Sequence, residues 1–119
     1  MNYYRNENGE IGVLISKGFG AGWSTWNQAE IAYDKRVVEY FLEHYNDANW
    51  MNKIGSRHTN DVQDEFIRLL QTWGYDSVYI RGFVDCELYF VPSGTPFRIE
   101  EYDGSESLTI GTDTFTILY

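Results

Sequence analysis

Closely spaced turn residues divide the second half of the chain into short apolar stretches, and this pattern constrains the fold more than any other feature. Asp103-Gly104 is a typical two-residue hairpin turn, and a second break lies at Pro92–Pro96. Short strands joined by tight turns predict antiparallel pairing. The strands predicted for this half are Ser77–Arg81, Cys86–Val91, Phe97–Tyr102, Ser107–Ile110 and Thr114–Tyr119.

Helical periodicity replaces the strand pattern in the middle of the chain. Asp34 is a predicted N-cap for a helix over Lys35–Tyr45, and Asn60 with Gln63 forms a predicted capping box for a second helix that ends at Gly74. Each helix carries an apolar stripe, so each is expected to pack on the core along one side. The stripes are Val37, Val38, Phe41, Leu42 and Tyr45, and then Val62, Phe66, Leu69, Leu70 and Trp73.

The N-terminal region adds a predicted strand or hairpin over residues 3–16, with Asn8-Gly9 as its turn. The apolar run Ile11–Ser16 predicts a buried strand, and residues 28–33 are compatible with one helical turn. A chain of 119 residues is long enough for one core, so residues 1–119 are expected to form a single domain. We therefore expect an α+β fold, with an antiparallel sheet of about five to six strands and two helices packed on one face.

The stretch from residue 17 to residue 27 holds three of the eleven glycines and two of the four tryptophans. Gly18, Gly20 and Gly22 alternate with other residues, and Trp23 and Trp26 follow. A glycine-rich turn after a strand is the setting of phosphate-binding loops, although Trp23 stands where G-x-G-x-x-G needs its third glycine. The glycines can instead allow a tight bend beneath core-capping tryptophans. A third interpretation makes the tryptophans exposed anchors for a partner.

Acidic residues are concentrated in the second half of the chain. Residues 1–60 carry 7 acids and 6 bases, a net charge of -1, and residues 61–119 carry 11 acids and 3 bases, a net charge of -8, which together give the formal net charge of -9. Such a field repels nucleic-acid phosphates and favours basic protein partners. It also favours solubility, which is the alternative explanation.

The densest acidic segment surrounds the Asp103-Gly104 turn and contains Glu100, Glu101, Asp103 and Glu106. In an extended strand, Glu100 faces one side and Glu101 faces the other. Charges on both faces of a hairpin are typical of an edge that resists strand pairing, and they can also dock a basic surface. We expect docking rather than acid–base catalysis, because no second catalytic group accompanies the carboxylates.

Residue types that carry chemistry are few, so the sequence favours a protein that is not an enzyme. His44 and His58 lack metal-type spacing, and the single cysteine, Cys86, lies in an apolar stretch typical of a buried thiol. Ser24 lacks the G-x-S-x-G context. No catalytic residue, metal site or cofactor is predicted. The polar N-terminus and the absence of a long apolar run predict a cytoplasmic protein without membrane association, and the tyrosine-rich composition is compatible with a homodimer.

Two stretches resemble small uncharacterised proteins encoded by bacteriophages. They are residues 12–27, which contain Gly-Phe-Gly-Ala-Gly-Trp-Ser-Thr-Trp-Asn, and residues 91–106, which contain Gly-Thr-Pro-Phe-Arg-Ile-Glu-Glu-Tyr-Asp-Gly-Ser-Glu. The resemblance implies a phage origin and a location in the host cytoplasm. Small acidic phage proteins often bind and disable a host defence protein, including CRISPR effectors, so an anti-CRISPR-type function is the expectation.

The segment Gly94–Ile99 also resembles the strand near the C-terminal end of ADP-ribosyltransferase domains. That family needs an early Arg or His, then Ser-Thr-Ser, then a Glu-x-Glu pair. Arg5 is the preceding candidate for the first element, and Ser24-Thr25-Trp26 departs from the second.

The sequence therefore supports three hypotheses of different kinds. The first is a non-enzymatic inhibitor that binds a basic surface of a host protein through Glu100, Glu101, Asp103 and Glu106, with Trp23 and Trp26 as anchors. The second is a nucleotide- or NAD-binding domain, or an ADP-ribosyltransferase-like domain, that uses the glycine-rich loop. The third is a structural or virion-associated module in which the loop serves the fold alone.

Overall fold

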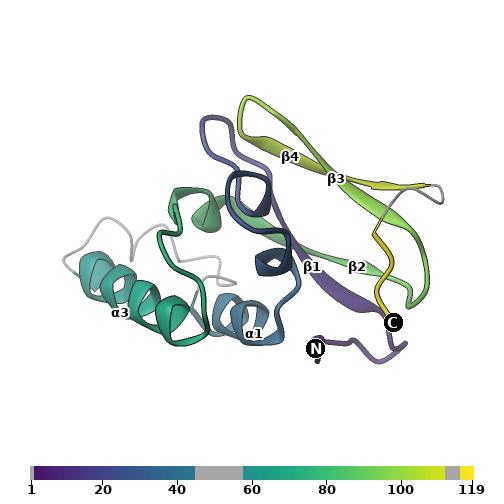
Figure 1. The fold of residues 1–119 in the computed structure, drawn as a ribbon, viewed down its shortest axis with the longest axis horizontal. Helices are drawn as coiled ribbons and strands as arrows, with labels where there is room; N and C mark the ends of the chain where they lie inside the picture. The colour runs from purple at the N-terminus through teal and green to yellow at the C-terminus, as the bar shows by residue number, and fades with distance from the viewer. Residues whose placement is uncertain (1, 45–57, 112–115) are drawn as a thin grey trace.

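The computed structural model describes residues 2–44, 58–111 and 116–119 and has an α+β architecture. Figure 1 shows the two α-helices on one side of the β1–β2 pair and the β3–β4 hairpin on the other side. The elements in chain order are β1 (Ile11–Ser16), η1 (Ser24–Trp26), η2 (Ala29–Ala32), α1 (Lys35–His44), α3 (His58–Thr72), η3 (Arg81–Asp85), β2 (Cys86–Val91), β3 (Phe97–Tyr102) and β4 (Ser105–Ile110), where η denotes a 3-10 helix.

The strands in the described residues form two antiparallel pairs, β1 with β2 and β3 with β4. The first pair runs from Ile11 opposite Val91 to Ser16 opposite Cys86. The predicted α+β class and the antiparallel pairing are confirmed, whereas the single sheet of five to six strands is not. Local turn signals miss the β1–β2 pairing because its two strands lie far apart in the sequence.

Strand β1 is buried along its whole length because both of its faces are covered. Leu14 packs on one face with residues of α1 and α3, whereas Val13 and Ile15 pack on the other with Phe97 of β3. This explains the run of consecutive apolar residues, since a strand covered on both faces loses the alternation of apolar and polar side chains. The predicted buried strand at Ile11–Ser16 is confirmed.

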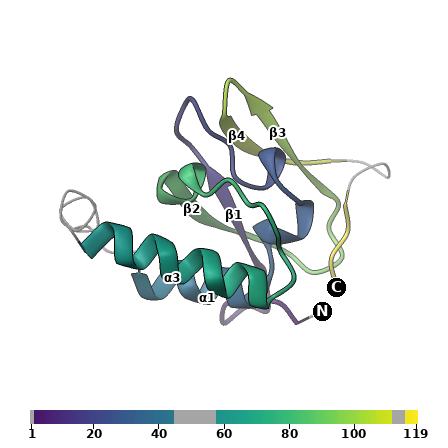
Figure 2. The same cartoon turned by 60° about the vertical axis from the view of Figure 1, so that its left-hand side comes forward.

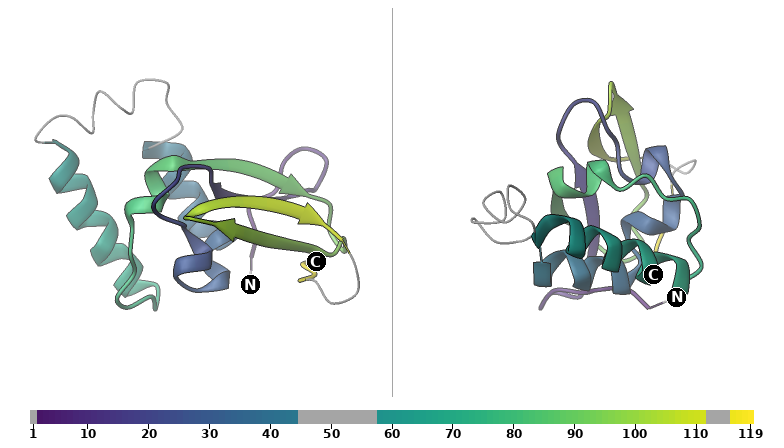
Figure 3. Two further views of the ribbon diagram at one scale, coloured as in Figure 1. Left: turned by 90° about the horizontal axis from the view of Figure 1, so that it is seen from above. Right: turned by 90° about the vertical axis from the view of Figure 1, so that its left-hand side faces the viewer.

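The two helices lie side by side against this core, as the turned views show (Figures 2 and 3). Tyr40 of α1 stacks on Phe66 of α3 with ring centroids 4.7 Å apart. Asp34 caps α1 as predicted, since its Oδ1 accepts the backbone amide of Arg36 at 2.9 Å. Helix α3 begins at His58, before the predicted cap at Asn60, and a glycine with φ 97° at position 74 follows its end. Tyr45 lies outside the described residues, and the side chains of Val62 and Gln63 are not described.

The predicted strand Ser77–Arg81 is wrong. The chain is irregular up to residue 80 and then forms η3, and Ser77 has a positive φ of 58°. Gly82 within η3 lies so close to Gly22 that an added Cβ would sit 2.2 Å from the Gly22 carbonyl oxygen. Packing of η3 against the glycine-rich loop thus overrides the β-branched and aromatic composition of this segment.

The ends of the described chain add two isolated bridges rather than full strands. Arg5 pairs with Ile11 around the predicted Asn8-Gly9 turn, where Gly9 has φ 78°. Thr116 pairs with Phe97 on the outer edge of β3. The predicted strand Thr114–Tyr119 is represented by this bridge alone, and its first two residues lie outside the described part of the chain.

Candidate functional site

The glycine-rich loop after β1 lies beside the turn of the β3–β4 hairpin, and Figure 1 shows the two tips together. The Gly20 amide donates to the carbonyl of Asp103 at 2.7 Å, and the Ser105 hydroxyl donates to the carbonyl of Lys17 at 3.2 Å. A Cβ on Gly104 would sit 2.3 Å from the Ala21 nitrogen, so this position accepts only glycine without a backbone shift. We call this arrangement the joined tips.

The loop glycines serve close contacts within the protein. A Cβ on Gly18 would meet the Asp85 carboxylate at 2.3 Å, and one on Gly22 would meet the Thr25 hydroxyl oxygen at 2.6 Å. Gly20, with φ 92°, instead provides a backbone conformation that L side chains rarely adopt. Of the three interpretations of the loop, the close-packed bend is the one that these contacts support.

Glu106 of β4 holds the loop from inside. Its Oε1 accepts the Ser16 amide at 2.9 Å, and its Oε2 accepts the amides of Trp23 at 2.8 Å and Thr25 at 3.0 Å together with the Thr25 hydroxyl. The side chain is 1% exposed. The predicted partner-binding role of Glu106 is therefore corrected, because a partner cannot reach this carboxylate. The alternation of side chains along the strand is the sequence feature that indicates this burial, because it places Glu106 on the same face as the apolar Leu108.

Trp23 is also buried, with no exposed surface, so its predicted role as a surface anchor is corrected. Its ring packs against Phe83 and Phe66 at centroid distances of 4.8 and 6.1 Å. Its indole Nε1–H donates to the carbonyl of Ile31 at 3.2 Å, which satisfies the one polar atom of the side chain. Trp23 therefore has the core-capping role that the structural interpretation of the loop predicts.

Trp26 is exposed and held in a fixed orientation. Its ring stacks on Tyr79 at a centroid distance of 5.8 Å and an interplanar angle of 20°. Its Nε1–H donates to the carboxylate of Glu101 at 3.1 Å. Asn27 ties the two segments together, since its amide donates to the Tyr79 carbonyl at 3.0 Å and accepts the Tyr79 amide at 2.9 Å. Sequence reasoning missed Tyr79 because it assigned this residue to a strand.

Exposed aromatic and acidic side chains gather around the joined tips. Phe19 at the tip of the loop is 71% exposed, and Tyr102 beside the hairpin turn is 79% exposed. Hydrogen bonding from Trp26, and then from the Gly104 amide, lowers the pKa of Glu101. Glu100 forms an ion pair with Arg98. We define the aromatic–acidic surface as Phe19, Trp26, Tyr79, Tyr102, Glu100, Glu101 and Asp103, which surround the joined tips on both faces of the hairpin, since Glu100 and Tyr102 lie on one face of β3 and Glu101 on the other.

The cysteine and the described histidine both lie in structural contacts. Burial, followed by the nearby carboxylates of Glu106 and Asp85, raises the pKa of the Cys86 thiol well above its ordinary value, so the thiol stays protonated. His44 lies against Tyr40 on α1, and the side chain of His58 lies outside the described residues. No group of three metal-binding side chains occurs in residues 2–44, 58–111 and 116–119.

The elements suggested by the ADP-ribosyltransferase resemblance do not meet. Arg5 pairs with Ile11 at the start of β1 and donates to the carbonyls of Gly9 and Tyr119. Thr25 bonds to Glu106, which also binds Ser16 at the end of β1. The length of the strand, about 17 Å, separates these two positions.

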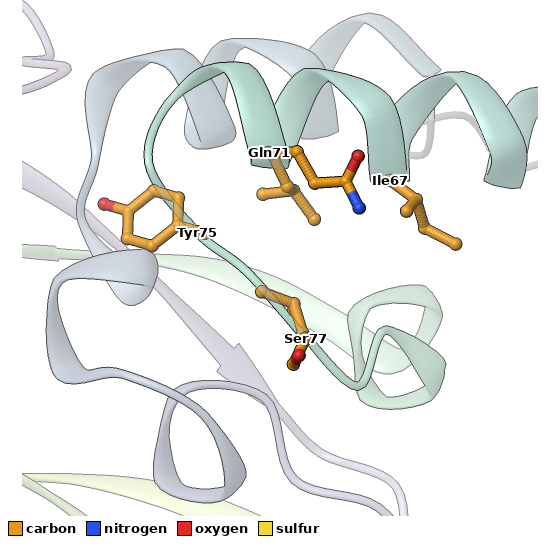
Figure 4. Close-up of a pocket in the computed structure, with 6 residues that line it drawn as sticks. Ile67, Gln71, Tyr75 and Ser77 are labelled. Atoms are coloured by element: carbon orange, nitrogen blue, oxygen red, sulfur yellow. The ribbon is translucent and has the colours of Figure 1, made fainter.

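Two of the cavities in the described part of the chain lie beside the core. The first, of about 200 Å³, lies between η1, η2 and β3 and is bordered by Ala29, Tyr33, Phe97 and Ile99. The second, of about 150 Å³, lies between α3 and the segment that follows it. Figure 4 shows Ile67 and Gln71 on α3 and Tyr75 and Ser77 on the segment that follows it; all four border this second cavity.

Comparison of the chain with protein-family models, curated proteins and solved structures gave no match. None of the helices in the described residues is both long enough and apolar enough to cross a membrane.

Proposed function

We propose that this protein acts by binding another protein, with the aromatic–acidic surface docking on a basic surface of the partner. The observation that carries the proposal is the placement of exposed aromatic rings among carboxylates on a backbone anchored by Glu106. Aromatic side chains supply most of the energy in many interfaces, and fixed rings lose little entropy when they bind. The surrounding carboxylates favour association with a basic partner.

The resemblance to bacteriophage proteins extends this proposal to a class of partner. We infer that the partner is a host antiviral defence factor, such as a CRISPR effector. Effectors that bind nucleic acid carry basic grooves for phosphates. An acidic surface of the kind described here is complementary to such grooves, and the net charge of -9 adds long-range attraction.

The direct test captures partners from a host lysate at low and high salt and compares two charge-reversed variants. One combines Glu100→Lys, Glu101→Lys and Asp103→Lys on the aromatic–acidic surface. The control combines Glu39→Lys, Asp64→Lys and Glu65→Lys, which reverse three exposed carboxylates on α1 and α3. Both change the net charge by the same amount. We expect the first to lose a stoichiometric, salt-sensitive partner and the control to keep it; equal retention by both would overturn the proposal.

Nucleotide or NAD binding is a second candidate, favoured by the exposed ring of Trp26, on which a base could stack. Two loop amides, those of Trp23 and Thr25, already donate to Glu106, and nearby carboxylates oppose a phosphate. The structure therefore gives this candidate less support than protein binding. A thermal melting screen with nucleotides and NAD near about 1 mM tests it, since a ligand that binds the folded state raises the melting temperature.

A further inference from the structure

Arg36 shows how this chain holds a guanidinium group of its own. Its Nε and one terminal nitrogen donate to the two carboxylate oxygens of Asp34, at 3.1 and 2.8 Å. Its guanidinium carbon also lies over the ring of Trp73, 5.4 Å from the centroid. The cation therefore has two partners at once, a carboxylate that accepts its hydrogen bonds and an indole whose π face attracts its charge.

Trp26 and Glu101 place the same two kinds of partner together at the joined tips. The indole Nε1–H donates to Glu101 Oε1 at 3.1 Å, so the carboxylate lies at the edge of an exposed ring. In residues 2–44, 58–111 and 116–119, no lysine or arginine lies over Trp26 or over Tyr79, on which it stacks. The described part of the chain thus supplies the ring and the carboxylate of a guanidinium site without the cation.

The carboxylate of Glu101 can accept further hydrogen bonds. Its Oε1 accepts the Trp26 indole N–H and the Gly104 amide, at 3.1 Å each, whereas its Oε2 accepts no hydrogen bond from the described residues. A carboxylate offers about four acceptor positions on its two oxygens. The bonds to Oε1, that of Trp26 first, fix the orientation of the group and lower its pKa. Because Glu101 is exposed, a donor on a partner can reach it.

The ring of Trp26 is fixed although much of it meets solvent. It stacks on Tyr79, and an added Cβ on Gly22 would lie 2.7 Å from Trp26 Cδ1, so the edge of the ring rests against the Gly22 backbone. Trp26 nevertheless remains 43% exposed and Tyr79 46% exposed. A ring that is already ordered loses little conformational entropy when a ligand binds to it.

The charges around the ring favour a cation as that ligand. Glu101 and Glu106 lie directly opposite each other in the β3–β4 pair, so their side chains are on the same face of the hairpin. Arg98, the cation of β3, is on the opposite face, where it pairs with Glu100. Two carboxylates of the hairpin therefore lie on the side that meets Trp26, and the arginine of β3 lies on the other.

We propose that the exposed surface of Trp26 and Glu101 binds an arginine side chain, which the basic partner supplies. The guanidinium plane lies against the indole, and its N–H groups donate to Glu101 Oε2. Arginine fits this site better than lysine, because its planar, weakly hydrated group stacks on aromatic rings, whereas the lysine ammonium is compact and strongly hydrated. This inference rests on the proposed function, because it names the side chain by which the partner is recognised.

The test titrates the full chain with a capped Gly-Arg-Gly peptide and, separately, with a capped Gly-Lys-Gly peptide. Binding is followed by the NMR signals of the Trp26 indole N–H and the Gly104 amide, which both donate to Glu101. We expect the arginine peptide to shift both signals to saturation. The lysine peptide should bind about two- to fivefold more weakly, which corresponds to the loss of one cation–π contact at an exposed site.

Three variants locate the binding. Glu101→Gln keeps the shape of the side chain but removes its charge, and it should weaken arginine binding at least about fivefold. The control, Glu65→Gln, makes the same change of charge at an exposed position on α3 and should bind arginine like the unchanged protein. Trp26→Leu should abolish the preference for arginine over lysine, because it removes the ring. Spectra of the free variants check that each is folded.

The outcomes separate this inference from the proposed function. Equal binding of the arginine and lysine peptides would overturn the arginine site and leave docking on a basic surface intact. Equal weakening by Glu101→Gln and Glu65→Gln would also overturn it, because net charge alone would then explain the binding, and so would the absence of any shift at millimolar peptide. Equal capture by the two charge-reversed variants, with arginine binding retained, would overturn the proposed function and with it the partner as the source of the arginine.

Discussion

The carboxylate of Glu106 accepts the backbone amide of Trp23 at 2.8 Å, a bond that joins segments 83 residues apart in the chain. The same carboxylate accepts the amides of Ser16 and Thr25, so one side chain orders the loop from its start to η1. The exposed Trp26 follows directly and binds Glu101 of the same hairpin. The conformation of the aromatic–acidic surface therefore depends on a residue that is itself inaccessible.

Replacing Glu106 by glutamine should destabilise the fold by about 2 kcal/mol, because the amide loses the charge and one acceptor while the donors stay buried. Urea denaturation measures this free energy. The matched control is Glu100→Gln on the exposed face of the hairpin, which should change stability by less than about 0.5 kcal/mol. Equal effects of the two substitutions would contradict the anchoring role of Glu106.

The two tryptophans of the loop should separate stability from binding. Trp23→Ala empties a core site and should cost about 3–5 kcal/mol of unfolding free energy. Trp26→Ala removes an exposed ring and should cost less than about 1 kcal/mol. In the capture experiment, Trp26→Ala should weaken the partner interaction although the protein stays folded. A large loss of stability in Trp26→Ala would show that this ring belongs to the core.

Gly104→Ala should destabilise the fold more than Gly9→Ala, although both glycines have a positive φ. Both Gly104 and Gly9 have positive φ, 87° and 78°, so alanine is strained at each by about 1–2 kcal/mol. Only at Gly104 does the added Cβ also meet backbone, 2.3 Å from the Ala21 nitrogen; at Gly9 nothing lies within 4 Å. Melting temperatures should fall further for Gly104→Ala, and similar falls would argue against the close contact of the joined tips.

The free energy of unfolding should fall at acidic pH, and protonation of Asp34 should account for part of this loss. Burial acts to raise the pKa of this carboxyl, but hydrogen bonds from Arg36 and Tyr75 outweigh burial, so the pKa of Asp34 is lowered on folding. As the pH falls, the unfolded chain takes up this proton first. The contribution is therefore complete above the unfolded pKa of about 4 and is lost below it. Denaturation at a series of pH values should give a shallower acid slope for Asp34→Asn than for the unchanged protein.

Local patterns predicted the elements that depend on neighbouring residues. The stripe and cap of α1, the buried run of β1 and the hairpin turn at Asp103 are encoded within a few residues, and they are confirmed. Pairing of β1 with β2 was not predictable in this way, because nothing near either strand specifies a partner so distant in the sequence.

The candidate site was predicted only in part, again because it forms where segments distant in the sequence meet. The sequence singled out the glycine-rich loop and the acidic hairpin, but their contact is a tertiary property. Burial of Glu106 and Trp23 follows from that contact, since the loop supplies the donors that make a buried carboxylate tolerable. Tyr79 was missed because its composition favours a strand, whereas packing of the following η3 against Gly22 sets the backbone there.

The complete burial of β1 has a consequence for the chain as it is synthesised. Ser16 ends this strand, and the Glu106 carboxylate that binds its amide is made 90 residues later. At about 5–20 residues per second, roughly 5–18 s therefore pass between the synthesis of the apolar run and the synthesis of Glu106 in the hairpin that covers its second face. During that time we expect the apolar side chains of Ile11, Val13, Leu14 and Ile15 to be targets for holding chaperones. Their release depends on a segment that is made 90 residues later.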